Sequence, residues 1–184
     1  MKNIFIFFTF SLMFINQPDL MSQIIIKDFN YQSDLSNWVI VNDDVMGGVS
    51  SCEISINNDG NGVFEGYIST ANNGGFSSIR LNLEKIAVKE GAYFKIRLKG
   101  DNKTYQFRVK KNISDYYSYI FPFTTSNEWE TITIPLNEMY PSFRGRKLDM
   151  KNFNNNSFEQ IMFLAGNKKN EKFKLIIDSI VLFN

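Results

Sequence analysis

Apolar and polar residues alternate along most of the chain, and this period of two constrains the fold more than any other feature. Residues 93–99 (YFKIRLK) place Phe94, Ile96 and Leu98 on one face and three basic side chains on the other, as a half-buried strand requires. Similar runs, separated by clusters of Gly, Asn and Asp, predict about eleven short strands. They cover residues 24–29, 38–41, 49–56, 63–70, 76–83, 93–99, 105–110, 116–123, 129–134, 160–164 and 173–183.

This pattern predicts an all-β fold that buries one face of many short antiparallel strands, either a sandwich or a closed barrel. Residues 93–99 and 105–110 flank a turn-rich link at residues 100–103, which indicates a hairpin. Residues 135–143 are expected to hold one helical turn or an irregular loop, and the Asn-rich residues 147–157 an exposed loop. Since no internal repeat or linker divides the chain, the pattern favours one domain.

The first residues are typical of a secretory signal peptide. Lys2 precedes an apolar run at residues 4–15 (IFIFFTFSLMFI), which has signal-peptide length and falls short of the ~20 residues that span a membrane. We expect cleavage after Ser22, which gives a signal peptide of residues 1–22 and a mature domain of residues 23–184, exported to the periplasm or secreted. No transmembrane anchor is expected after cleavage. An uncleaved anchor is the alternative, because Lys2 is the only basic residue of this segment.

Composition excludes several classes of chemistry. The chain has no His and a single Cys, which rules out Ser-His and Cys-His nucleophile systems, imidazole or cysteine-rich zinc sites and an intramolecular disulfide. Cys52 occupies an alternating position, which favours a buried structural thiol over a reactive one. The net charge is +1 and the charges are interspersed, so no strong field attracts nucleic acid or an anionic membrane. No cofactor is expected.

Three segments break the alternation, and loops of this kind are where a binding site is expected. Residues 38–51 contain two carboxylates, a Gly pair and two hydroxyl side chains. Residues 72–78 combine a Gly pair with amides and hydroxyls, and residues 140–146 set two guanidiniums beside aromatic rings and a proline. The Gly pairs indicate positive φ or a close backbone approach, although each pair could serve a turn alone.

The charged residues of these segments allow more than one role. Asp43 and Asp44 either hydrogen-bond turn backbone or bind a ligand. As neighbours on a strand they would face opposite sides, which is poor geometry for a glycosidase pair. Calcium ligation is conceivable, but the spacing is not that of a calcium loop, and no metal is expected. Arg144 and Arg146 would share one face of an extended segment and could hold an anion, the alternative being solvated surface arginines.

Taken together, these segments resemble the complex I intermediate-associated protein 30 family. The resemblance rests chiefly on residues 42–51 (NDDVMGGVSS) and 72–80 (NNGGFSSIR). It continues through residues 64–66, 98–101, 105, 129, 134–135, 143–146 and 173–180, so it covers nearly all of the expected mature chain in order. The resemblance implies an antiparallel β-sandwich of the jelly-roll, galactose-binding-domain-like type, in agreement with the alternation.

For function, the resemblance implies a non-enzymatic, chaperone-like factor that in the mitochondrial members assists assembly of NADH:ubiquinone oxidoreductase. The family offers no catalytic residues to transfer. An exported protein would lie away from the side where NADH is oxidised, so the fold is implied more firmly than the assembly role. The candidate binding residues are Asp43, Asp44, Met46, Gly47, Gly48, Ser50, Asn72, Gly74, Gly75, Phe76, Asp101, Tyr105, Arg144 and Arg146.

Two functions of a non-enzymatic binding protein follow. The first is an assembly factor that binds proteins, such as respiratory-complex subunits, through an exposed apolar patch that includes Met46 and Phe143. The second is an exported carbohydrate-binding module whose loops bring aromatic, amide and charged groups together. Its expected sugar contacts are Trp38, Asn72, Asp101, Tyr105 and Arg144. A hydrolase is disfavoured by the lack of His and by the placement of the carboxylates.

Overall fold

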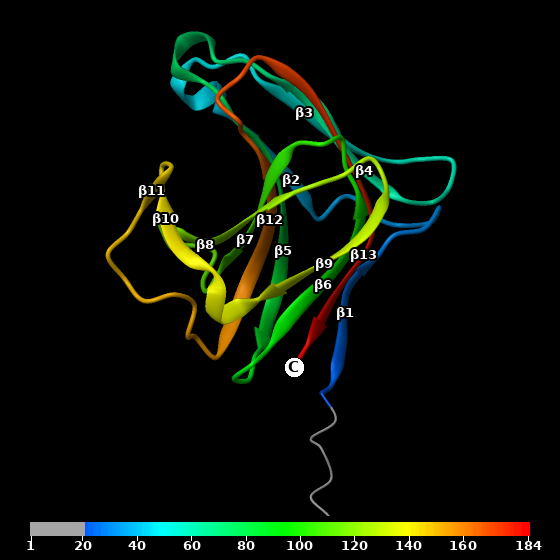
Figure 1. The fold of residues 1–184 in the computed structure, drawn as a ribbon, viewed down its shortest axis with the longest axis vertical. Coiled ribbons are helices and arrows are strands. Elements are labelled where there is room, and N and C mark those ends of the chain that lie inside the picture. Colours follow the sequence, from blue (N-terminus) through cyan, green and yellow to red (C-terminus); the bar gives the residue numbers. More distant parts are fainter. Residues whose placement is uncertain (1–20) are drawn as a thin grey trace, which may run out of the picture.

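The computed structural model describes residues 21–184, which form an all-β sandwich of two antiparallel sheets (Figure 1). Nearly all of the expected signal peptide lies outside the described residues. Within residues 21–184 no helix has the length and apolar character needed to cross a membrane. The helices of this part are three short 3-10 turns, η1 (Asp43–Met46), η2 (Ala71–Asn73) and η3 (Leu136–Glu138).

The six-stranded sheet runs in the order β3-β4-β13-β6-β9, with β1 added beside β13. The first half of β13 pairs with β4 and its second half with β1, so this long strand forms the spine of the sheet. The strands are β1 (Gln23–Asp28), β3 (Ser51–Ile56), β4 (Gly62–Ile68), β6 (Tyr93–Lys99), β9 (Trp129–Pro135) and β13 (Glu171–Phe183).

The seven-stranded sheet runs in the order β11-β10-β8-β7-β12-β5-β2. Figure 1 shows it as the second layer, with β10 and β11 at one side of the molecule and β1 and β4 at the other. The strands are β2 (Trp38–Asn42), β5 (Ser77–Ala87), β7 (Thr104–Lys110), β8 (Ser118–Thr124), β10 (Tyr140–Phe143), β11 (Arg146–Lys147) and β12 (Ser157–Ala165).

The core lies between the sheets and is rich in phenylalanine. Phe94 of β6 packs edge-on against Phe107 of β7 with ring centroids 4.9 Å apart, and Phe107 packs against Phe163 of β12 at 5.3 Å. All three side chains are fully buried. Burial of each such side chain contributes about 1.5–3 kcal/mol, and the alternation of the strands turns these rings to one side only.

All of the predicted strand segments are found as strands, but the predicted hairpin between residues 93–99 and 105–110 is wrong. These residues form β6 and β7, which lie in different sheets. Both strands turn an apolar face toward the same core, so they face each other across the sandwich and do not pair edge to edge. The link crosses between the layers at Gly100, where an added Cβ would lie 2.1 Å from Thr125 Oγ1.

Two polar segments are more ordered than their sequence indicates. Residues 135–143 hold the expected helical turn as η3, but β10 follows it and pairs with β8. Residues 147–157 are not a wholly exposed loop, because Phe153 is buried and packs edge-on against Tyr119 at 5.0 Å. This ring and hydrogen bonds such as that from Asn155 Nδ2 to Tyr119 OH at 3.1 Å hold the loop against the core.

Candidate functional site

Two of the irregular segments meet at the carboxylate of Asp43, which is 2% exposed. Its Oδ2 accepts hydrogen bonds from Ser50 Oγ at 2.6 Å, from Gly75 N at 2.5 Å and from Phe76 N at 3.3 Å. Its Oδ1 accepts from Ser50 N at 3.1 Å. We call Asp43, Ser50, Gly75 and Phe76 the Asp43 cluster. It joins the segment after β2 to the segments that precede β3 and β5.

The glycines of both segments are required by this cluster. A Cβ on Gly48 would lie 2.2 Å from Asp43 Oδ1, and one on Gly74 would lie 2.5 Å from Oδ2. Gly47 ends η1 in the left-handed conformation with φ of 80°, which favours glycine. Asn72 Nδ2 donates to the carbonyl of Gly47 at 2.9 Å and ties η2 to η1. In each Gly pair, one residue therefore packs against the carboxylate (Gly48 and Gly74) and the other has a positive φ (Gly47 and Gly75).

The Asp43 cluster is complete without a ligand. Burial alone would raise the pKa of Asp43, but the hydrogen bonds from Ser50, Gly75 and Phe76 outweigh it and hold the pKa below its usual value. The carboxylate is thus ionised and satisfied inside the protein. Asp44 is exposed on η1, and the side chain of Met46 lies outside the described part of the structure.

Asp101 forms a second internal cluster at the link between β6 and β7. Its carboxylate accepts hydrogen bonds from Tyr105 OH at 2.8 Å, Lys103 Nζ at 2.7 Å and Lys174 N at 2.9 Å. Tyr105 is 1% exposed, and burial, reinforced by the Asp101 hydrogen bond, raises the pKa of its hydroxyl far above the usual value. Asp101 and Tyr105 therefore anchor the link and leave the Tyr105 ring in the core.

A hollow of about 660 Å³ opens beside Asp101 on the six-stranded sheet. Four of its charges form two ion pairs, since Lys103 contacts Asp101 and Lys174 Nζ lies 3.0 Å from Glu65 Oε2. Cys52 also lines the hollow, and burial raises the pKa of its thiol to about 11. The thiol is therefore protonated near neutral pH, as expected of a structural cysteine.

Arg144 and Arg146 do not share the face of an extended segment. Arg144 and Gly145 form the tight turn between β10 and β11, with φ of 48° and 75°, and Arg146 is the first residue of β11. Two successive positive φ values are typical of a two-residue hairpin turn. The Arg144 guanidinium lies 5.3 Å from the centre of the Phe143 ring, and both arginines are exposed.

The sugar contacts expected from the loops do not converge. Trp38 and Tyr105 are buried in the core, whereas Asn72 lies on η2 and Arg144 on the β10–β11 turn. The expectation treated aromatic residues at strand ends as exposed. The long-range packing of the sandwich, with Trp38 near Phe29 at 6.0 Å, buries these rings instead.

A different set of polar residues gathers on the outer face of the seven-stranded sheet. Alternate residues of its strands point into the core, so the residues between them lie on the outer face. The strand register sets them in three rows. The central row is Val39, Arg80, Met162, Arg108, Ile120 and Tyr140; the flanking rows are Val41, Ser78, Leu164, Gln106 and Pro122, and Asn82, Gln160 and Lys110.

This outer face combines buried polar atoms with solvent access. Gln160 is 4% exposed and donates from Nε2 to Asn82 Oδ1 at 2.6 Å, but its Oε1 is buried without a hydrogen-bond partner. Arg80 Nε is likewise buried and unpartnered within residues 21–184. Arg80, Arg108 and Tyr140 remain partly exposed. A donor, Arg80 Nε, and an acceptor, Gln160 Oε1, thus lack hydrogen-bond partners on a face that solvent reaches. A bound polar ligand would supply these partners.

Arg108 is the most firmly positioned cation of the outer face. Its Nε and Nη2 both donate to Gln106 Oε1, at 3.1 and 2.5 Å, and its Nη1 lies 3.5 Å from Ser118 Oγ. Burial, together with the nearby charge of Arg80, lowers the pKa of Arg108 to about 10, while Tyr140 acts in the opposite direction. The guanidinium therefore stays charged at neutral pH and is held by neutral partners alone.

Sequence reasoning missed the outer face because its rows depend on register between strands far apart in the chain. The alternation did place Arg108 and Lys110 opposite the core side of residues 105–110, but outward basic residues are usually solvated. Arg80 entered only as the last residue of a family motif. A useful signal was the absence of any acidic residue among the outward positions of residues 104–110.

Within residues 21–184 no group of three or more Cys, Asp and Glu side chains is placed to hold a metal ion.

Comparisons with known proteins agree with this geometry. The family model described as complex I intermediate-associated protein 30 matches residues 27–177. No curated protein sequence matches the chain. Among solved structures, a family 11 carbohydrate-binding module from Clostridium thermocellum in complex with a β-1,3-1,4-mixed-linked tetrasaccharide has a TM-score of 0.66 at 18% identity, covering 88% of this chain and 95% of that one.

A family 29 carbohydrate-binding module complexed with mannohexaose is more distant, with a TM-score of 0.54 at 13% identity over 88% of this chain and 90% of that one. Identities at this level show likeness of fold. They place the chain among jelly-roll sandwiches.

Replacing the carboxylate of the Asp43 cluster should destabilise the fold. Asp43→Asn keeps the shape but substitutes a donor where four donors converge, so we expect a loss of roughly 2–4 kcal/mol in unfolding free energy by urea titration. Because the folded pKa is lowered, the carboxylate stabilises the fold fully above its unfolded pKa of about 4 and loses this effect as the pH falls through the lower folded value. The gap between wild type and variant should therefore shrink below about pH 4.

Asp59→Asn, at an exposed turn, is the matched control and should change stability by less than about 0.5 kcal/mol. An Asp43→Asn variant as stable as this control would show that the carboxylate does not fasten the loops.

Proposed function

This chain belongs to the complex I intermediate-associated protein 30 family, and we propose that it is a non-catalytic protein that binds carbohydrate on the outer face of its seven-stranded sheet. The observation that carries this proposal is the pair of buried, unpartnered atoms on that face, Gln160 Oε1 and Arg80 Nε. Sugar hydroxyls both donate and accept hydrogen bonds. One ligand of this kind can therefore satisfy the amide oxygen and the guanidinium together.

The central row also supplies apolar contact area. Met162 and Ile120 are buried beside the two arginines, and Tyr140 ends the row as a partly exposed ring. Lys147 Nζ lies 5.2 Å from the centre of the Tyr140 ring. Strands in a sheet are about 4.8 Å apart, so the row from Arg80 to Tyr140 crosses four gaps and extends roughly 19 Å. A surface of this length suits an extended chain molecule more than a compact small ligand.

The likeness in fold supports the same proposal. Two of the similar solved structures are carbohydrate-binding modules described in complex with oligosaccharides, and a module of this kind binds without catalysis. The lack of His excludes a Ser-His or Cys-His hydrolase, and the Asp43 carboxylate is held by internal donors.

Removing the ring at the end of the central row should weaken glycan binding. We expect Tyr140→Ala to lower affinity about tenfold, a loss of about 1.4 kcal/mol, for the polysaccharide that binds best in affinity electrophoresis across soluble plant, algal and bacterial polysaccharides. Trp129→Ala is the matched control, since Trp129 is exposed on the six-stranded sheet. It should leave affinity unchanged. Absence of binding to every polysaccharide, or equal loss in both variants, would contradict the proposal.

Protein binding is a second candidate function, favoured by an exposed aromatic pair. Tyr116 and Phe143 are 64% and 37% exposed, and their ring centroids lie 5.2 Å apart in an edge-on contact. Phe143 belongs to the apolar patch expected from the sequence. Exposed aromatic residues that contact one another are typical anchors of protein interfaces, and an assembly factor for a respiratory complex would bind subunits in this way.

Capture from cells tests the second function. After mild crosslinking, the wild-type protein should recover respiratory-complex subunits, and the double variant Tyr116→Ser with Phe143→Ser should reduce that recovery at least tenfold. Ile25→Ser removes an equally exposed apolar residue from β1 and should have no effect. Recovery of the same subunits by the double variant at the wild-type level would exclude this surface as the interface.

Export of residues 23–184 as one domain is part of the proposed function. Ser22 and Asn184 exchange backbone hydrogen bonds at 2.7 and 2.8 Å immediately before β1, so the expected cleavage site borders the sandwich. The intact mass of the protein from the periplasm or medium should correspond to a chain that begins at Gln23. Recovery of the full-length mass in the membrane fraction would instead support an uncleaved anchor.

A further inference from the structure

We infer, on the basis of the proposed function, that the glycan bound on the outer face is acidic, and that Arg80, Arg108 and Lys110 bind its carboxylate or sulfate groups. Arg80 and Arg108 flank Met162 in the central row, two strand spacings or roughly 10 Å apart. Lys110 lies in the next row, opposite Gln160. Three cations from two strands thus line one continuous stretch of sheet.

No acidic residue shares the three rows with these cations. Within residues 21–184 no carboxylate lies within ion-pair distance of Arg80, Arg108 or Lys110. Arg108 is held by Gln106, and Lys110 Nζ by the carbonyls of Ile113 and Asp115 at 3.1 and 2.5 Å. These hydrogen-bond partners are neutral; the Asp115 carboxylate offsets part of the charge of Lys110, but among the described residues no carboxylate acts in this way on Arg80 or Arg108.

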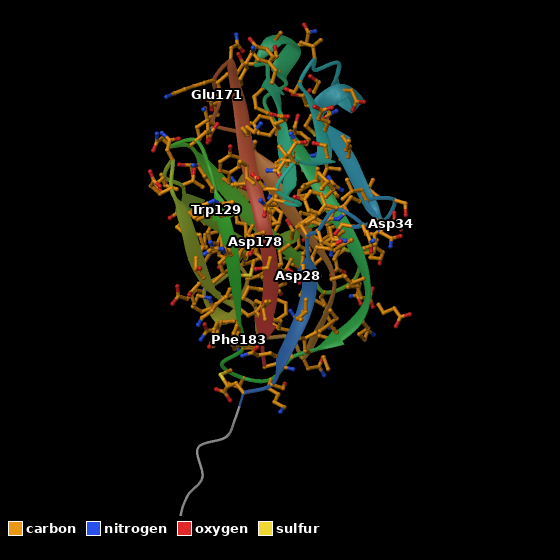
Figure 2. The ribbon with its side chains drawn as sticks, turned by 90° about the vertical axis from the view of Figure 1, so that its right-hand side faces the viewer. Asp28, Asp34, Trp129, Glu171, Asp178 and Phe183 are labelled. Carbon is orange, nitrogen blue, oxygen red and sulfur yellow. The ribbon has the colours of Figure 1, made fainter. Side chains whose placement is uncertain are left out.

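The opposite sheet provides an internal comparison. There the Arg97 guanidinium lies 3.5 Å from Asp178 and 5.2 Å from the centre of the Trp129 ring, and Figure 2 labels Asp178 and Trp129 on this side of the molecule. Lys174 likewise pairs with Glu65 at 3.0 Å. Arg97 and Lys174 thus have carboxylate partners, whereas within residues 21–184 none of Arg80, Arg108 and Lys110 forms an ion pair.

Mutual repulsion makes the unpaired cations costly in the absence of ligand. Burial lowers the pKa of Arg80 and of Lys110, and the charge of Arg80 lowers the pKa of both Arg108 and Lys110 further, while Asp115 raises the pKa of Lys110. Partly buried charges without counter-charges destabilise a fold. An anionic group placed between Arg80 and Arg108 removes this repulsion and supplies the missing acceptor for Arg80 Nε.

The orientation of Arg108 suits an anion rather than a lone hydroxyl. Gln106 accepts from Nε and Nη2, which fixes the plane of the guanidinium and leaves Nη1 available for the ligand. Nη1 already donates one N–H to Ser118 Oγ at 3.5 Å, so its second N–H is the one that a ligand can accept. A guanidinium held in one plane recognises carboxylate and sulfate oxygens with defined geometry. Gln160 and Asn82, in the row beside it, can serve the neutral hydroxyls of the same sugar chain.

Paired polysaccharides that differ only in charge test the inference. Polygalacturonate is compared with its methyl ester, and dextran sulfate with dextran, by calorimetry on the full protein at low and high NaCl. We expect at least one acidic member to bind at least tenfold more tightly than its neutral partner, with affinity that falls as NaCl increases. The pair that responds distinguishes a carboxylate from a sulfate ligand.

Variants then locate the charge on the outer face. Arg80→Gln and Arg108→Gln should each weaken binding of the acidic glycan at least tenfold, with no loss of melting temperature for Arg80→Gln because repulsion is relieved. Arg97→Gln is the matched control on the opposite sheet and should keep wild-type affinity. Equal weakening by Arg97→Gln would show diffuse attraction to the whole protein and would overturn the inference.

The remaining outcomes separate the inference from the proposed function. Tight, salt-insensitive binding of neutral members, sensitive to Tyr140→Ala, would overturn the acidic ligand and retain carbohydrate binding. If inorganic polyphosphate bound as tightly as the acidic glycan, the assignment of a sugar chain as the ligand would be overturned. Absence of binding to all four polysaccharides and to the wider set used for Tyr140→Ala would overturn both.

Discussion

The buried carboxylate of Asp43 fastens one end of the sandwich, and the rest of the structure depends on it. Its hydrogen bonds join the turn after β2 to Ser50, immediately before β3, and to Phe76, immediately before β5. The end of β2, an edge strand of the seven-stranded sheet, is thereby held to the start of its neighbour β5 and to the start of β3 in the other sheet. Since β5 starts at this point, the cluster also fixes the register that places Arg80 in the central row.

Polar groups in this protein fall into two energetic classes. Asp43 and Asp101 are surrounded by hydrogen-bond donors, so they stabilise the loops that they join. Arg80, Arg108 and Gln160 lie on a face formed by strands. Arg80 Nε and Gln160 Oε1 lack hydrogen-bond partners, and Arg108 has no ion pair within residues 21–184. Because unpaired, partly buried groups lower stability, selection for stability alone would not favour them. Their position on rigid strands instead favours a preorganised binding surface, which loses little entropy when a ligand binds.

The fold could be predicted from the sequence because alternation is a local signal. Apolar residues at alternate positions, such as Phe94, Ile96 and Leu98, indicate which face of the strand is buried. Strand partners are not local, which is why β6 and β7 were expected to pair and instead lie in different sheets. The same limit hid the site, since Arg80 and Arg108 become neighbours only through β12. Loop residues such as Asp43 were found by sequence reasoning, but whether a carboxylate faces a ligand or backbone donors depends on the loop opposite.

The family motifs and the candidate site overlap on β5, where Arg80 belongs to both. The motifs that carry the resemblance, residues 42–51 and 72–80, are the segments that meet at Asp43, and packing around it requires Gly48 and Gly74. Arg108 and Gln160 lie outside these motifs, on strands whose outward residues do not affect the core. Outward positions can change while the Asp43 cluster is kept, because the two faces of a strand are independent. Membership of the family thus constrains the fold of this chain, whereas the carbohydrate ligand that we propose would be selected by the outward residues of β5, β7 and β12.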